Sequence, residues 1–171
     1  MKVLNFGSLN IDMVYSVDHV VRPGETTASA ELSYFCGGKG LNQSVALARA
    51  GAEVCHAGCV GADGGRLISL LRDNGVDTSL VTKSESPSGH AIIQVDRDGQ
   101  NSILLFGGAN MEITPEQIEN AVGNFSMGGR LFLQNEINDI SEIIGAAHAR
   151  GMEIVFNPSP FGAEILSYPL E

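Results

Sequence analysis

Short apolar runs alternate with amphipathic segments along most of this chain. Four runs are mainly apolar and bounded by turn residues, as is typical of strands buried in a parallel sheet: residues 2–7, 54–60, 131–134 and 153–156. Between them, apolar side chains recur at helical spacing in residues 38–50, after Asp63, from Thr114 to about Val122, and after Asp139. This alternation predicts an α/β fold with a parallel sheet and right-handed crossovers.

Several of the predicted helix ends carry capping residues. Thr114-Pro115-Glu116-Gln117 forms a capping box with proline at the first helical position, so a helix begins there. Gly51 and the pair Asn74-Gly75 are typical C-terminal caps of the two earlier helices. We interpret Asp63 as the N-cap of the second helix rather than as a catalytic group.

A second group of segments mixes β-branched, aromatic and polar residues. These segments are residues 11–21, 28–35, 80–82, 91–96 and 102–106. The first two flank the turn Arg22-Pro23-Gly24-Glu25, and the last two flank a hairpin-like turn. We expect a small antiparallel sheet, inserted as segments of about 11–36 and 90–106 into one domain that spans residues 1–171.

Composition and charge narrow the classes of protein. The 171 residues are 43% hydrophobic and 18% charged, which suits one ordinary soluble core. The net charge is −10 and no Lys/Arg run occurs, so nucleic acid is not an expected partner. No secretory signal and no apolar stretch of about 20 residues is present, so we expect a cytoplasmic protein with no membrane contact.

Neither the cysteines nor the histidines form a metal-binding pattern. The three cysteines, Cys36, Cys55 and Cys59, include no C-x-x-C pair, which argues against a zinc knuckle and a disulfide framework. Cys55 and Cys59 lie on one face of a predicted strand, where free cysteine packs as a small apolar residue. The four histidines lack ligand spacing, so we expect no metal site in this chain.

A glycine-rich turn at residues 33–42 leads directly into a helix. It lacks the first glycine of a phosphate-binding Walker A loop, because Ser33 stands there, and Gly40 replaces the Ser or Thr. It also lacks the third glycine of a Rossmann dinucleotide fingerprint. What remains is a tight turn with Lys39 and Asn42 available for hydrogen bonds, which suits a neutral polyol better than a triphosphate.

Several short motifs follow one another in a characteristic order. They are Gly7-Ser8-Leu9-Asn10-Ile11-Asp12, Pro23-Gly24-Glu25-Thr26, Gly37-Gly38-Lys39-Gly40-Leu41-Asn42-Gln43, Val60-Gly61-Ala62-Asp63, Gly107-Gly108-Ala109-Asn110, Gln134-Asn135-Glu136 and Asn157-Pro158-Ser159-Pro160. Together they resemble the ribokinase branch of the PfkB carbohydrate kinase family. The resemblance covers essentially the whole chain, although any one motif alone would be a weak signal.

The resemblance implies a ribokinase-like α/β fold, with helices on both faces of a parallel-stranded core and a small antiparallel β lid. It also implies a kinase that transfers the γ-phosphoryl group of ATP to O5 of D-ribose. Mg²⁺ would accompany ATP, and K⁺ is a further candidate ion. The expected partners are a small sugar, D-ribose first, and a second copy of the chain bound through the lid.

By the same resemblance, the sugar would lie between the core and the lid. Its hydroxyl groups would contact six residues: Asn10, Asp12, Gly38, Lys39, Asn42 and Glu136. Asn110 would line the lid side of the pocket. Carboxylates, amides and an ammonium suit a pentose, because each sugar hydroxyl is both a donor and an acceptor.

Each of these residues also has a purely structural interpretation. The alternatives are an exposed strand position for Asp12, a turn hydrogen bond for Asn10, a solvated charge for Lys39, a backbone partner at a helix start for Asn42, a helix cap near Asp139 for Glu136, and a strand end for Asn110.

Two motifs of the PfkB family that this chain resembles are missing from the sequence. The family's Gly-Ala-Gly-Asp motif supplies the base and the phosphate-stabilising backbone, and its Asn-x-x-Glu motif is associated with magnesium and phosphate; neither occurs here. Family members run to about twice this length, so the chain corresponds to an N-terminal, sugar-binding half, with the catalytic Asp expected beyond residue 171. We expect this half alone to bind no nucleotide strongly and to lack transfer activity.

Two other functions are alternatives to a sugar kinase. A non-catalytic sugar-binding or dimerisation module would use the same residues without phosphoryl transfer. A Rossmann-type oxidoreductase would bind NAD, which the failed glycine fingerprint disfavours.

Because the sequence stops soon after the fourth core strand, the sheet should have an unpaired edge, which favours dimers or aggregates.

Overall fold

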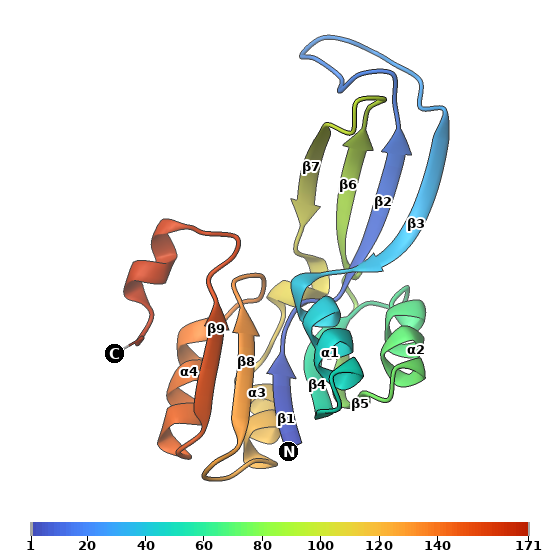
Figure 1. Ribbon diagram of the computed structural model, residues 1–171. Helices are drawn as coiled ribbons and strands as arrows, with labels where there is room; N and C mark the ends of the chain where they lie inside the picture. The colour runs from blue at the N-terminus through green and yellow to red at the C-terminus, as the bar shows by residue number, and fades with distance from the viewer. Residues whose placement is uncertain (1, 171) are drawn as a thin grey trace.

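Two β-sheets meet near the middle of the molecule (Figure 1). In the computed structural model, which describes residues 2–170, a five-stranded sheet with helices forms the base. A four-stranded sheet stands off from the ends of its strands. Among the described residues, no helix is long and apolar enough to cross a membrane.

The base sheet has the strand order β5-β4-β1-β8-β9, and every neighbouring pair is parallel. Its strands are β1 (Lys2–Phe6), β4 (Glu53–Val60), β5 (Asp77–Lys83), β8 (Arg130–Gln134) and β9 (Glu153–Asn157). The four strands predicted from apolar runs are confirmed. The placement of residues 80–82 in the antiparallel group is wrong, because β5 pairs in parallel with β4.

The reason for that error lies in the position of β5 at the edge of the base sheet. Buried and exposed residues alternate along it: Thr78 and Leu80 are buried, whereas Asp77 and Ser79 are exposed. An edge strand that is covered on one face alternates in polarity in the same way as a strand of a half-solvated antiparallel sheet. The local pattern therefore could not distinguish the two.

Four α-helices cover the base sheet, two on each face (Figure 1). Those on one face are α1 (Lys39–Arg49) and α2 (Gly65–Asp73), and those on the other are α3 (Pro115–Gly123) and α4 (Ile140–Ala149). All four predicted helices are confirmed. The Thr114 hydroxyl accepts a hydrogen bond from the Gln117 backbone N–H at 3.2 Å, which is one half of the capping box, while the Gln117 side chain donates to the Gly58 carbonyl oxygen at 2.8 Å.

The interpretation of Asp63 as an N-cap is wrong. Helix α2 begins at Gly65, its N-cap position is Gly64, and no side chain caps it. The Asp63 carboxylate instead accepts hydrogen bonds from the backbone N–H and the hydroxyl of Ser88, at 2.9 and 2.6 Å. It therefore ties the loop after β4 to Ser88, which directly precedes a strand of the second sheet and is 25 residues away, a distance that local spacing does not reveal.

Each face of the base sheet packs its own apolar cluster. The larger cluster places Leu4, Phe6, Leu131 and Leu133, all fully buried, against α3 and α4. Cys55, Ala57 and Cys59 also belong to it, which confirms the predicted core packing of the two cysteines. The smaller cluster lies on the α1 and α2 face and includes Leu41, Leu67 and Leu71.

The second sheet has the order β3-β2-β6-β7. Its strands are β2 (Asn10–Ser16), β3 (Glu31–Gly37), β6 (Gly89–Val95) and β7 (Asn101–Phe106). The hairpins β2–β3 and β6–β7 are antiparallel as predicted, but β2 and β6 are parallel, so the sheet is mixed rather than antiparallel. Strands β1 and β5 are parallel, and each leads next in the chain to a strand of the second sheet. Consequently β2 and β6 enter it in the same direction.

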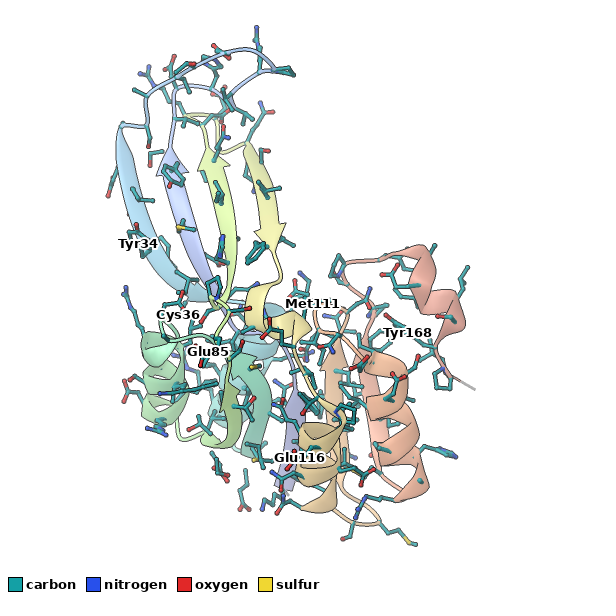
Figure 2. All side chains as sticks on the ribbon, turned by 180° about the vertical axis from the view of Figure 1, so that it is seen from behind. Tyr34, Cys36, Glu85, Met111, Glu116 and Tyr168 are labelled. Carbon is teal, nitrogen blue, oxygen red and sulfur yellow. The ribbon has the colours of Figure 1, made fainter. Side chains whose placement is uncertain are left out.

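The side chains of the two sheets differ in how they are covered (Figure 2). Tyr34 on β3 is 49% exposed, whereas Met111 lies in the 3-10 helix η1 (Gly108–Met111) where the sheets meet. At the other side, Tyr168 follows the 3-10 helix η2 (Ala163–Ser167).

Within residues 2–170, β9 pairs only with β8, which confirms the predicted open edge.

Leu133→Ala tests whether the larger apolar cluster carries the stability of the base. Leu133 is fully buried in the middle of the sheet, so the substitution should lower the free energy of unfolding by about 2–5 kcal/mol. Urea denaturation followed by circular dichroism measures the change. Leu166→Ala, at a side chain that is 85% exposed, should stay within about 0.5 kcal/mol of the wild type; equal effects of both variants would contradict this assignment of the core.

Candidate functional site

The implied sugar-binding residues lie at the carboxyl ends of the central strands, under the root of the second sheet. Asn10, Asp12, Gly38, Lys39, Asn42 and Glu136 line one cavity of about 200 Å³, together with Ala91, Ile93, Ile103 and Leu105. They come from β2, from the start of α1 and from the loop after β8, while the apolar residues come from β6 and β7. Three segments far apart in the chain thus converge on one crevice between the two sheets.

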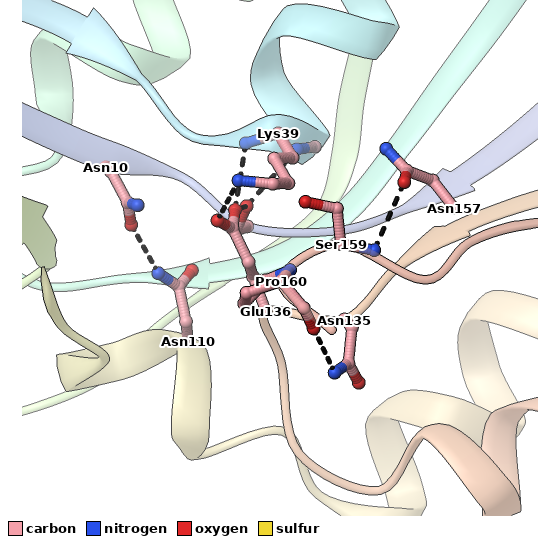
Figure 3. Close-up of polar contacts among 10 residues, drawn as sticks. Asn10, Lys39, Asn110, Asn135, Glu136, Asn157, Ser159 and Pro160 are labelled. Carbon is pink, nitrogen blue, oxygen red and sulfur yellow. Dashed lines mark hydrogen bonds and ion pairs between the residues drawn. The ribbon is translucent and has the colours of Figure 1, made fainter. Parts of the chain in front are cut away.

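Glu136 is the most highly connected side chain of this cavity (Figure 3). Its Oε2 accepts hydrogen bonds from the Ser8 hydroxyl at 2.6 Å and from the Lys39 backbone N–H at 3.0 Å. Its Oε1 accepts from Lys39 Nζ at 2.8 Å. The Lys39 N–H belongs to the first turn of α1, where unpaired backbone donors favour a carboxylate. The alternative role of Glu136 as a cap of α4 is wrong, since no side chain caps that helix.

The Asp12 carboxyl faces the cavity without a partner from the protein. No hydrogen bond or ion pair joins it to another group among residues 2–170. Burial raises its pKa, and the negative charge of Glu136 raises it further, while the Lys39 ammonium partly offsets both. A partly desolvated carboxylate without donors is unfavourable unless a bound molecule supplies them. Asp12 is therefore the acidic side chain of this cavity whose hydrogen-bonding capacity remains available to a ligand.

Asn110 lies behind the cavity rather than at the end of a strand. It is 2% exposed, belongs to η1, and its Oδ1 accepts a hydrogen bond from the Leu9 backbone N–H at 2.9 Å. Its Nδ2 donates to Asn10 Oδ1 at 2.7 Å, as Figure 3 shows. Asn110 lines a neighbouring cavity of about 350 Å³ that shares Asn10 and Glu136 with the first. Its contacts fix the amide of Asn10 at the start of β2.

The glycine-rich turn holds Lys39 and Asn42 at the start of α1. Gly38 has a φ of +96°, and a Cβ there would lie 2.9 Å from the Ser8 carbonyl oxygen. The close approach that the glycine permits is thus to the protein's own backbone as well as to the cavity. The Asn42 backbone N–H donates to the Gly38 carbonyl, whereas the Asn42 side chain makes no hydrogen bond within the described chain.

Ser8, for which the sequence predicts no role, lies at the centre of these contacts. Ser8 is fully buried, its hydroxyl donates to Glu136, and the same oxygen accepts from the Gly40 backbone N–H at 3.2 Å. The only signal in the sequence was its place directly after a buried strand, within the Gly7–Asp12 motif.

The last motif, Asn157–Pro160, supports the site from outside. The Asn135 side chain, next to Glu136, donates to the Pro160 carbonyl oxygen at 2.7 Å (Figure 3). It also donates to Glu164 Oε1 at 2.8 Å, which contributes to the lowered pKa of Glu164. The segment after β9 therefore fixes the loop that carries Glu136, without lining the 200 Å³ cavity itself.

The described residues do not fit a magnesium site. Among residues 2–170, no three His, Cys, Asp or Glu side chains lie together as a group that could hold a metal ion. Asp12 and Glu136 are the two acidic groups of the cavity, and Glu136 is already paired with Lys39.

The fold and this cavity define an α/β protein with a polar crevice between a parallel base sheet and a mixed second sheet. The family model of the pfkB family carbohydrate kinases matches residues 1–168. The chain therefore belongs to the pfkB carbohydrate kinase family, as the motifs indicated.

Relatives of known sequence are similar over nearly the whole chain. Ribokinase of Staphylococcus aureus is 38% identical over 176 aligned residues, which cover 97% of this chain and 58% of the relative. Ribokinase of Haemophilus influenzae is 35% identical, with 94% and 54% covered. A deoxyribokinase of Salmonella typhimurium is 32% identical, with 98% and 57% covered. The chain spans about half the length of the curated relatives it matches.

Solved structures give the same result for the fold. The ribokinase of Cryptococcus neoformans, solved in complex with ADP, superposes with a TM-score of 0.83 at 36% identity, covering 98% of this chain and 53% of that one. The ribokinase of Thermotoga maritima also gives 0.83 at 36% identity, with 94% and 54% covered. The ribokinase-like α/β fold is thereby confirmed.

Asp12→Asn should stabilise the chain at neutral pH in the absence of a ligand. The pKa of Asp12 is raised in the folded state, so folding is favoured below the unfolded aspartate pKa of about 3.9 and loses that contribution as the pH rises through the folded pKa. The variant removes this loss. Its melting temperature should exceed that of the wild type at pH 7, and the difference should vanish below about pH 4.

Calorimetric melting at pH 7 and at acidic pH measures this difference. Asp98→Asn, in the exposed turn between β6 and β7, is the matched control and should show no such change with pH. A wild type that is more stable than Asp12→Asn at pH 7 would show that the carboxylate has a stabilising partner in the folded chain.

Proposed function

We propose that this chain forms the sugar-binding part of a ribokinase-like kinase that phosphorylates D-ribose at O5. The observation that carries the proposal is the unpartnered Asp12 carboxylate, which faces the same cavity as the Glu136–Lys39 pair. The names of the relatives, ribokinases and a deoxyribokinase, support a pentose as the substrate class.

The cavity suits a small neutral polyol. Asp12 accepts hydrogen bonds from hydroxyl groups, while the amide of Asn42 and the ammonium of Lys39 donate to them. Two carboxylates against one ammonium leave the cavity with a negative balance, which disfavours a sugar that is already phosphorylated.

In the complete kinase, ATP with Mg²⁺ supplies the γ-phosphoryl group, and K⁺ remains a candidate activating ion. The residues described here bind and orient the sugar so that its primary hydroxyl faces the incoming phosphoryl group, which is the contribution of positioning to such a transfer. The groups that stabilise the phosphate and accept the hydroxyl proton are expected in the remainder of a full-length protein of this family. We propose the cytoplasm as the compartment of this kinase.

A non-catalytic sugar-binding module is the second candidate. The observation that favours it is the chemistry of the described cavity, whose polar side chains all suit hydrogen bonds with hydroxyl groups. Mixing this chain with a separately expressed C-terminal half of a relative distinguishes the two functions. ADP release with D-ribose supports the kinase; sugar binding without ADP release supports the module.

A thermal-shift titration of the chain tests sugar binding directly. D-ribose should raise the melting temperature of the wild type by mass action, whereas adenosine and NAD should not. Asp12→Ala should abolish the shift, because it removes the carboxylate that faces the cavity. Asp98→Ala, at an exposed acidic residue of the β6–β7 turn, should keep it. A shift by NAD alone would refute the kinase assignment.

We further propose that the chain self-associates through the second sheet. Leu32, Tyr34, Leu104 and Phe106 lie on one face of the second sheet by its register and are 39–67% exposed, an apolar surface that suits burial against another copy. Size-exclusion chromatography with light scattering should show a dimer at tens of micromolar. Leu104→Lys should weaken it, whereas Met127→Lys, at an 85% exposed residue outside the second sheet, should not. A wild type that is purely monomeric would contradict the proposal.

A further inference from the structure

A chain of four polar side chains lies inside the base, on the face covered by α1. Asn5 of β1, Ser44 of α1, His56 of β4 and Gln134 of β8 are each 0% exposed. Buried polar groups cost free energy unless they are fully hydrogen-bonded, and three strands and a helix contribute to this one group. We call these residues the buried network.

The hydrogen bonds of the buried network have one consistent direction. Gln134 Nε2 donates to Asn5 Oδ1 at 2.8 Å, and Asn5 Nδ2 donates to Ser44 Oγ at 2.7 Å. Ser44 Oγ lies 2.7 Å from His56 Nδ1, and His56 Nε2 lies 3.2 Å from the Gly7 carbonyl oxygen.

The position of the His56 proton follows from these partners. A carbonyl oxygen only accepts, so His56 must carry its proton on Nε2 and donate it to Gly7. Nδ1 is then an acceptor for the Ser44 hydroxyl. Burial lowers the pKa of His56 to about 4, which keeps the ring neutral at pH 7 and preserves this arrangement.

The buried network ends on the two backbone segments that form the floor of the candidate sugar site. His56 holds the Gly7 carbonyl, one residue before Ser8, whose hydroxyl donates to Glu136. Asn5 Nδ2 also donates to the Gly40 carbonyl at 2.7 Å, one residue after Lys39. The same Asn5 amide group thus links the first turn of α1 to His56 through Ser44.

These two segments pack too closely to move independently. A Cβ on Gly7 would lie 2.7 Å from the Gly40 Cα and would overlap the Gln134 side chain. The Leu41 backbone N–H also donates to the Ser8 carbonyl oxygen at 2.9 Å. A displacement of either segment would therefore change the distances from Ser8 and Lys39 to Glu136.

We propose that His56, Ser44, Asn5 and Gln134 are positioning residues for sugar binding. They hold the Gly7–Ser8 turn and the first turn of α1 at the separation at which Ser8 and Lys39 both meet the Glu136 carboxylate. None of the four lines the sugar cavity, so they act through the backbone and not through contact with the ligand. The inference rests on the proposed function, since sugar binding is the activity that they position.

Ser44→Ala separates this role from a general contribution to stability. It removes the hydroxyl between Asn5 and His56 without adding volume. We expect the dissociation constant for D-ribose, measured by calorimetry well below the melting temperature, to rise on the order of tenfold. Ser44→Thr, which keeps the hydroxyl, should restore most of the affinity.

Val54→Ala is the matched control. Val54 lies on β4 two residues before His56, on the same face, and is 2% exposed, but it packs only in the apolar cluster. It should lower the melting temperature and leave the affinity for D-ribose unchanged. If Ser44→Ala changes the affinity no more than Val54→Ala does, the positioning role is overturned and the proposed function stands.

Nuclear magnetic resonance of the ligand-free chain tests the inference even if no sugar binds. Long-range proton–nitrogen spectra of the wild type should show the Nε2–H tautomer of His56 at pH 7; the Nδ1–H tautomer would overturn the directed network.

In Ser44→Ala, the amide signals of Ser8 and Lys39 should move further than in Val54→Ala. Unmoved signals would overturn the positioning role. A wild type that binds no sugar, with these signals as expected, would refute the proposed function alone.

Discussion

The carboxylate of Glu136 connects the parts of the chain on which the site depends. It joins the turn after β1 through Ser8, the start of α1 through the Lys39 backbone and ammonium, and the loop after β8 that carries Glu136 itself. A carboxylate that is largely withdrawn from water is stable only when it is paired and hydrogen-bonded in this way. The same requirement fixes Lys39 beside the cavity, and it leaves Asp12 as the acidic group without a partner.

This arrangement separates two tasks within one small volume. Glu136 and Lys39 satisfy each other and organise the backbone, while Asp12 retains its hydrogen-bonding capacity at a cost in stability that its raised pKa reflects. Asn110 and the buried network around His56 perform a third task, which is to hold the surrounding backbone. Binding sites often combine groups that are satisfied internally with a few that are satisfied only by the ligand.

Much of the fold was predictable because its signals are local. The apolar runs of β1, β4, β8 and β9, the capping box at Thr114 and the helical spacing of the four helices each lie within about a dozen residues. The errors arose where partners are distant. The alternation of buried and exposed residues in β5 depended on its position at the edge of the sheet. The direction of β6 depended on the parallel course of β1 and β5, and the role of Asp63 depended on its contact with Ser88.

Local motifs and periodicity were enough to predict most of the elements, the family and the residue types of the candidate site, because these signals lie in consecutive positions. The folded chain was needed to show that Glu136 meets Ser8 across 128 residues, that Asn110 holds Asn10 across 100, and that a neutral His56 contacts the Gly7 carbonyl. Such pairings depend on which strands become neighbours in the sheet. The need to hydrogen-bond buried polar groups then selects among the partners that neighbouring strands bring close.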